Sequence, residues 1–115
     1  MLEREKSRRI VDELLTYFFS NDIDQVSLEL SFSEEGFLAS IEGYCEELPE
    51  DVYQFAENLN IPRNLDIESY YDELLGGHQS LHEEKDYQLL GMMIDNADIM
   101  YEDEKLMVEV FRRSY

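Results

Sequence analysis

The stretch from Val26 to Tyr44 constrains the fold of this chain most strongly. Apolar and polar residues alternate along residues 26–32, and such alternation is typical of a strand with one buried face. A polar Ser-Glu-Glu-Gly run at residues 33–36 predicts a turn, and alternation resumes along residues 37–44. We therefore predict an antiparallel hairpin, and its shared apolar face comprises Val26, Leu28, Leu30, Phe32, Phe37, Ala39 and Ile41.

The C-terminal part predicts a second hairpin. Leu106, Val108 and Val110 alternate with three residues of the opposite face, and a polar run at residues 102–105 separates them from the apolar segment 99–101. An isolated hairpin is marginally stable in water, so helices must cover the apolar side of both.

Four segments have helical spacing. The first spans residues 3–19 and has one apolar stripe, made of Ile10, Val11, Leu14, Leu15, Phe18 and Phe19. The second follows Pro49 and buries Val52, Phe55, Ala56 and Leu59. The third begins at Asp66 and includes Ile67, Tyr70, Tyr71, Leu74 and Leu75. The fourth spans residues 86–97, with Leu89, Leu90, Met93, Ile94 and Ala97 on its buried side. A polar loop over residues 78–85 precedes the fourth helix.

The order of elements is α-β-β-α-α-α-β-β, which predicts an α+β fold. We expect a two-layer α/β sandwich, in which the first and last helices cover one face of an antiparallel four-stranded sheet of two hairpins. The length of 115 residues predicts a single domain over residues 1–115.

The charge of the chain excludes some partners. There are 28 acidic and 9 basic residues, which give a net charge of −19. Such a field repels nucleic acid and anionic membranes, so we predict neither as a partner. Two interpretations remain open: the acidity keeps the protein soluble, or it forms a surface for a basic partner protein.

Cysteine content and hydropathy bear on the compartment. Cys45 is the only cysteine, so the chain has no internal disulfide and no thiolate metal cluster, and a structural thiol is expected there. No apolar run approaches the ~20 residues of a membrane span. We therefore predict a cytoplasmic protein.

Three stretches, together with the order of elements, carry a family resemblance. Residues 89–95 and the hairpin after them resemble the last helix and hairpin of the ATP-binding domain of histidine kinases, DNA gyrase and the anti-sigma-factor serine kinases, most closely that last group. The family's Glu-x-x-x-Asn motif aligns with Glu13 and Tyr17, and its Asp-x-Gly-x-Gly motif aligns with residues 42–46. Its phosphate-binding glycines fall near Glu84 and Asp86.

The nucleotide-binding groups of that family are replaced here. An aromatic ring at position 17 cannot supply the amide oxygen that the family uses to bind Mg²⁺, and carboxylates near residues 84–86 repel phosphates. The resemblance therefore implies a degenerate member that binds no ATP and needs no cofactor.

Other candidate sites give weaker signals. His78 and His82 have a spacing that suits a divalent metal on a helix, but they fall in the predicted loop, so we predict no metal site and exposed histidines. The methionines Met92, Met93, Met100 and Met107 suit either an adaptable binding surface or ordinary core packing.

Tyrosines on the middle helices are the predicted partner contacts, namely Tyr53, Tyr70 and Tyr71. Without a coherent catalytic group, we predict a non-enzymatic interaction or regulatory protein. The alternatives are an active ATP-dependent serine kinase or ATPase, and a metal-dependent enzyme that uses His78 and His82. The sequence also leaves a homodimer open, through a sheet edge or through the tyrosine-bearing helices.

Overall fold

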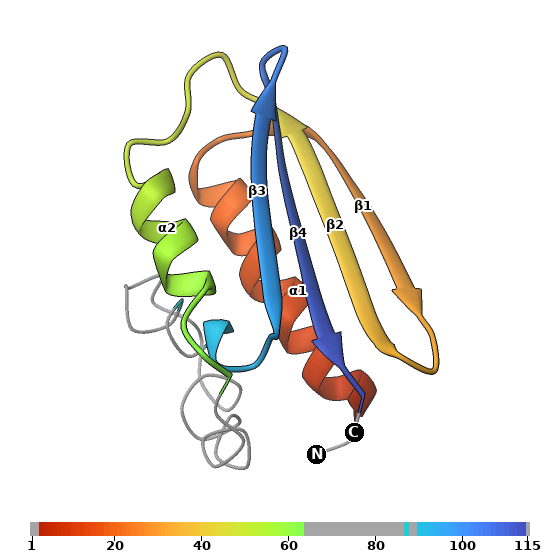
Figure 1. Ribbon diagram of the computed structural model, residues 1–115. Coiled ribbons are helices and arrows are strands. Elements are labelled where there is room, and N and C mark those ends of the chain that lie inside the picture. The colour runs from red at the N-terminus through yellow and green to blue at the C-terminus, as the bar shows by residue number, and fades with distance from the viewer. Residues whose placement is uncertain (1–2, 64–86, 88–89, 115) are drawn as a thin grey trace.

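A four-stranded antiparallel sheet with two helices on one side forms the part of the chain that the computed structural model describes, residues 3–63, 87 and 90–114 (Figure 1). The elements are α1 (Glu3–Ser20), β1 (Asp24–Phe32), β2 (Gly36–Tyr44), α2 (Val52–Leu59), β3 (Asn96–Glu102) and β4 (Lys105–Arg113). The strand order is β1-β2-β4-β3, so both predicted hairpins form and β2 and β4 meet at the centre. The predicted α+β class and the sheet of two hairpins are confirmed.

The first hairpin turns where predicted, but the burial of its first strand differs from the prediction. Phe37, Ala39 and Ile41 are buried in the core, and they pair with Phe32, Leu30 and Leu28. These three β1 side chains therefore lie on the helix side of the sheet, yet they are 41%, 45% and 39% exposed. The prediction that they are buried is wrong, because α1 packs on β2 and α2 on β3, and the helical layer does not extend over β1 (Figure 1).

Helix α1 presents a different stripe from the predicted one. Ile10, Leu14 and Phe18 are buried as expected, but Phe19 is 62% exposed and Leu15 only partly buried. The buried face is turned toward Tyr17, because α2 packs there. The Tyr17 and Phe55 rings are stacked, with centroids 3.7 Å apart and an interplanar angle of 4°.

A polar bond accompanies this stacking. The Tyr17 hydroxyl donates a hydrogen bond of 2.9 Å to Oδ1 of Asp51, the residue that precedes α2. Asp51 therefore joins α2 to α1 and makes no side-chain cap on its own helix. Burial, and then the bond to Asp51, raise the pKa of Tyr17 above its ordinary value.

The predicted fourth helix, residues 86–97, is wrong at its C-terminal end. Its predicted core residues Leu90, Met93, Ile94 and Ala97 are buried, but a turn follows Gly91 and β3 begins at Asn96. The amides of Met93 and Ile94 donate to the carbonyls three residues back, and the Asp95 amide donates to the Phe111 carbonyl, which begins the pairing with β4. The helix ends because strand pairing takes over its backbone groups.

The predicted number of four helices also differs from the structure, where the described residues contain two. The predicted helix from Asp66 to Leu75 lies outside the described residues, as does the polar loop of residues 78–85.

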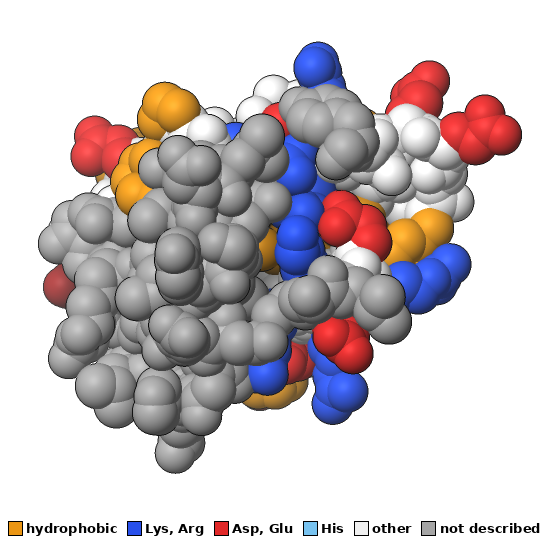
Figure 2. All heavy atoms as spheres, turned by 90° about the horizontal axis from the view of Figure 1, so that it is seen from below, with side chains coloured by type: hydrophobic (Ala, Val, Ile, Leu, Met, Phe, Trp, Pro, Cys, Tyr) orange, Lys and Arg blue, Asp and Glu red, His pale blue; other side chains and the backbone are white. Residues whose placement is uncertain are grey.

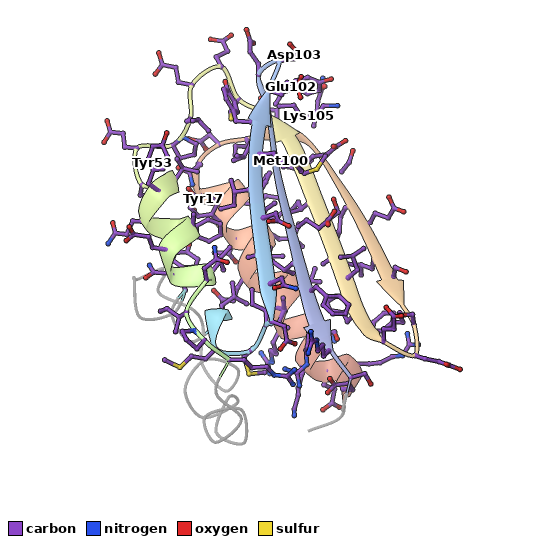
Figure 3. The ribbon with its side chains drawn as sticks, in the orientation of Figure 1. Tyr17, Tyr53, Met100, Glu102, Asp103 and Lys105 are labelled. Carbon is purple, nitrogen blue, oxygen red and sulfur yellow. The ribbon has the colours of Figure 1, made fainter. Side chains whose placement is uncertain are left out.

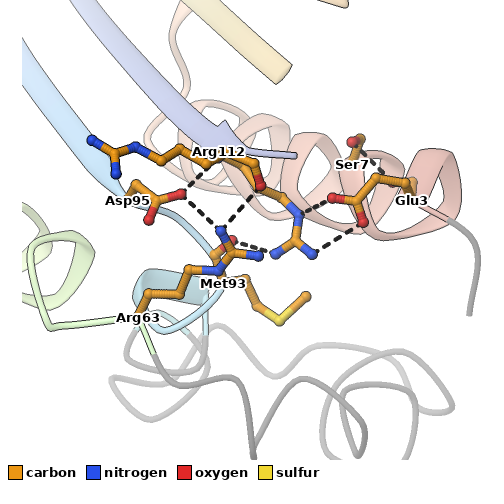
Figure 4. A network of polar contacts seen from close by, with 7 residues as sticks. Glu3, Ser7, Arg63, Met93, Asp95 and Arg112 are labelled. Carbon is orange, nitrogen blue, oxygen red and sulfur yellow. Dashed lines mark hydrogen bonds and ion pairs between the residues drawn. The ribbon is translucent and has the colours of Figure 1, made fainter. Parts of the chain in front are cut away.

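Buried polar contacts close one end of the sheet (Figure 4). Arg112, only 2% exposed, donates from Nε and Nη2 to the two carboxylate oxygens of Glu3, at 2.7 and 3.1 Å. Its Nη1 donates to the carbonyl of Met93 at 2.7 Å. Beside it, Asp95 accepts from Arg63 at 2.9 Å and from the Arg113 amide at 2.6 Å. The start of α1, the segment after α2 and the last residues of β4 are thereby held together.

Positive charge is concentrated at this same end, which Figure 2 views directly. Of the nine Lys and Arg residues, seven lie in the first two turns of α1, after α2 or at the end of β4, namely Arg4, Lys6, Arg8, Arg9, Arg63, Arg112 and Arg113. Lys105 begins β4 at the opposite end, and Lys85 lies outside the described residues. The rest of the described surface therefore carries the acidic excess.

Candidate functional site

The face of the sheet opposite the helices is covered by no helix of the described part of the chain (Figure 1). We call it the outer face. Pairing places its residues in rows across β1, β2, β4 and β3, and these rows are Ser31-Leu38-Phe111-Asn96, Glu29-Ser40-Glu109-Asp98, Ser27-Glu42-Met107-Met100 and Asp24-Tyr44-Lys105-Glu102. The outer face thus combines apolar, acidic and hydroxyl side chains.

Carboxylates dominate the middle of the outer face. Asp98 on β3 pairs directly with Glu109 on β4, so two like charges face each other across neighbouring strands. Directly opposed like charges are destabilising, and no ion pair between either carboxylate and a cation is observed in the described part of the chain. Glu42 differs, because Lys105 Nζ lies 3.8 Å from its Oε1. Two carboxylates are thus opposed across neighbouring strands on the uncovered face, with Asp98 exposed and Glu109 half-buried.

Two open depressions mark the outer face. One of 360 Å³ is lined by Ser27, Leu28, Glu29, Ser40, Glu42 and Met107. The other, of 290 Å³, is lined by Met100, Glu102, Asp103, Lys105 and Met107, and Figure 3 labels its first four residues. Met107 lines both. Their size and openness suit side chains of a larger partner better than an enclosed small molecule.

The four methionines have different environments. Met93 is fully buried in the core, and Met92 is half-buried. Met100 is 51% exposed and pairs with half-buried Met107 on the outer face. Core packing therefore holds for Met93, and the interpretation as an adaptable binding surface stays a prediction for Met100 and Met107.

The predicted tyrosine contacts are only partly described. Tyr53 points away from the core on α2 and is 77% exposed (Figure 3). Tyr70 and Tyr71 lie outside the described residues. Sequence reasoning named the tyrosines, Met100 and Met107 but missed Asp98 and Glu109. Asp98 lies outside the predicted strands, and its pairing with Glu109 depends on the register of β3 and β4.

Some of the positions that align with nucleotide-binding motifs lie in the packed part of the fold. Glu13 and Tyr17 are buried, and Tyr17 belongs to the α1–α2 contact. Gly43, within the segment aligned with Asp-x-Gly-x-Gly, lies so close to Ile23 that a Cβ would collide with it. Cys45 is half-buried, and burial raises the pKa of its thiol, which disfavours the nucleophilic thiolate.

In the part of the chain that the structure describes, no group of three or more His, Cys, Asp and Glu side chains is arranged to hold a metal ion. His78 and His82, the candidate metal ligands, lie outside the described residues, as do Glu84 and Asp86. Over the same described part, no helix has the length and apolar character needed to span a membrane.

Comparison with known proteins gives no family. No protein-family model, no curated protein and no solved structure matches this chain. The resemblance to the histidine-kinase-type ATP-binding domain stays a prediction, and the outer face is the site on which a functional proposal can be built.

Proposed function

We propose that this chain is a non-enzymatic interaction protein that binds a basic partner protein through the outer face of its sheet. The observation that supports this most directly is the opposed pair Asp98 and Glu109 on an uncovered face. Like charges in direct register cost stability, and a cationic side chain of a partner would relieve that cost.

The surroundings of the pair favour a protein as the partner. Met100 and Met107 lie in the next row, so the face offers adaptable apolar contact beside its carboxylates. Glu29, in the same row as Glu109, extends the negative charge toward β1. Apolar contact supplies most of the binding energy, and charge guides the encounter and sets specificity.

The test compares two variants with the same net charge. Asp98→Asn with Glu109→Gln neutralises the opposed pair, and Glu34→Gln with Glu35→Gln neutralises two exposed carboxylates in the β1–β2 turn. Binding of synthetic lysine-rich amphipathic peptides of about twenty residues, the size of one side of a typical interface, is measured by calorimetry and stopped-flow fluorescence.

The outer-face variant should bind these peptides more weakly than the turn variant, and its fold should be at least as stable as the parent's. Association should slow as salt rises. Equal binding by the two variants would mean that only net charge matters. Absence of peptide binding by the parent protein would refute the proposed function, and saturable binding of Mg²⁺-ATP would favour the kinase or ATPase alternative.

A further inference from the structure

Strand β1 is an edge strand with few of the features that usually protect an edge. It spans nine residues and pairs only with β2. Its register with β2 is regular from Ser27 to Phe32, and the irregularity near Gln25, whose φ is 54°, is confined to its start. Glu29 is the one charged residue of the regular stretch. Along its outer edge, no strand of the described chain meets its backbone N–H and C=O groups, which can template another strand.

If a strand from another molecule paired with β1, its side chains on the helix side would have to be apolar. Leu28, Leu30 and Phe32 form a row along this side of β1, and their exposed fractions are 39%, 45% and 41%. Side chains alternate between the two faces of a sheet, so every second side chain of an added strand would lie beside this row. Apolar residues at these alternate positions would complete the core beyond the limit of the helical layer.

On the outer face of β1, the side chains of an added strand would have to be basic. The depression of 360 Å³ lies there, and two of its lining side chains are the carboxylates of Glu29 and Glu42. Neighbouring strands are about 4.8 Å apart, so a lysine or arginine stem on an added strand reaches across β1. Ser27 and Ser40 supply hydroxyl partners in the same depression.

On the helix side, a cation of α1 already packs on the Phe32 end of the strand. The guanidinium carbon of Arg4 lies 3.9 Å from the centre of the Phe32 ring. A cation over an aromatic ring is favourable and needs no carboxylate beside it. Arg4 occupies this end, which leaves residues 27–31 as the accessible stretch.

We propose that the partner binds by adding to β1 an extended segment in which apolar and basic residues alternate. This inference rests on the proposed function and specifies how the basic partner is recognised. A second copy of the chain fits this edge poorly, because it would bring its own Glu29 and another net charge of −19.

The test uses a synthetic peptide of alternating lysine and valine with the nine-residue length of β1, and a control peptide with the same residues in two blocks. Two further versions carry N-methyl groups on alternate backbone nitrogens, one version for each edge of the peptide. The protein variants are Leu28→Thr with Leu30→Thr, and the control Tyr53→Thr on α2, which packs on β3 at the other edge.

We expect the alternating peptide to bind about tenfold more tightly than the block peptide. One N-methylated version should lose binding and the other should retain it, because only one edge of a strand hydrogen-bonds to β1. The β1 variant should weaken binding about fivefold or more, whereas Tyr53→Thr, at a tyrosine that the sequence predicts as a partner contact, should weaken it less.

Equal binding of both N-methylated peptides would overturn strand addition. In that case the proposed function would still stand if the variant with Asp98→Asn and Glu109→Gln bound basic peptides more weakly than the parent protein. Equal losses in the β1 and Tyr53 variants would place the contact on α2 and overturn the inference. A dimer in sedimentation that dissociates in the β1 variant would assign the edge to a second copy, which also overturns it.

Discussion

The ion pair between buried Arg112 and partly exposed Glu3 leads to a quantitative prediction. Glu3→Ala removes a carboxylate that accepts two hydrogen bonds from Arg112, at 2.7 and 3.1 Å. Charge-assisted hydrogen bonds contribute about 1.5–3 kcal/mol each. The Glu3 side chain is 44% exposed, so solvent screens part of this energy, and Arg112 keeps its bond to the Met93 carbonyl.

We therefore expect Glu3→Ala to lower the free energy of unfolding by about 2–3 kcal/mol. For a domain of this size, that corresponds to a fall in Tm of roughly 8–12 °C. The measurement is urea and thermal unfolding at neutral pH, followed by circular dichroism. Glu5→Ala is the matched control, because Glu5 is an exposed acid in the same helical turn.

A double-mutant cycle isolates the interaction itself. Arg112→Met retains an apolar stem in the buried site, and its combination with Glu3→Ala should cost less than the sum of the single changes, by about 1 kcal/mol or more. If Glu3→Ala stayed within about 0.5 kcal/mol of the parent, the carboxylate would be solvated and the energetic argument would be wrong.

Three further predictions concern stability. Because the raised pKa of Tyr17 means that the folded state holds its proton more tightly, its stabilising contribution is complete below about pH 10 and declines above it. Tyr17→Phe should lower the free energy of unfolding by about 1 kcal/mol at neutral pH. As the pH rises above about 10, the free energy of unfolding of this variant should fall less than that of the parent, and an identical fall in both proteins would contradict this. The β3–β4 turn residues Asp103 and Glu104 have φ of 52° and 62°, so Asp103→Asn with Glu104→Gly should raise the free energy of unfolding by about 1 kcal/mol, and an unchanged urea midpoint would refute the strain argument. Raising ionic strength from ~10 mM to ~150 mM shortens the Debye length from ~30 to ~8 Å and should raise Tm, whereas a flat or falling Tm would mean that the charges are compensated locally.

Alternation in the sequence predicted the hairpins well, because a period of two fits a strand and no helix. Residues 90–97 show the limit of such patterns. Leu90, Met93, Ile94 and Ala97 are buried as a helix would bury them, yet from residue 92 onward the backbone forms a turn and then the start of β3. The spacing of apolar residues predicted which side chains are buried. It did not predict the backbone conformation of this segment, which depends on pairing with β4.

The candidate site depended on contacts between distant segments. Alternation assigned Leu28 and Leu30 to the helix side, but it contains no information on how far the helical layer extends. It also could not show that Asp98 faces Glu109, because that pairing depends on the register of two strands. The extreme acidity was evident from composition, but the fold was needed to show that Asp98 and Glu109 lie on an uncovered face.

The unprotected edge of β1 gives the acidity of the chain a role in colloidal stability. Copies of a protein with such an edge tend to stack strand against strand into cross-β assemblies, and other proteins prevent this with lysines, prolines or bulges along the edge. Here long-range repulsion between copies of charge −19 can act in their place. That repulsion vanishes as the carboxylates are protonated toward the isoelectric point near pH 4.1, so acidification removes the barrier to fibril growth.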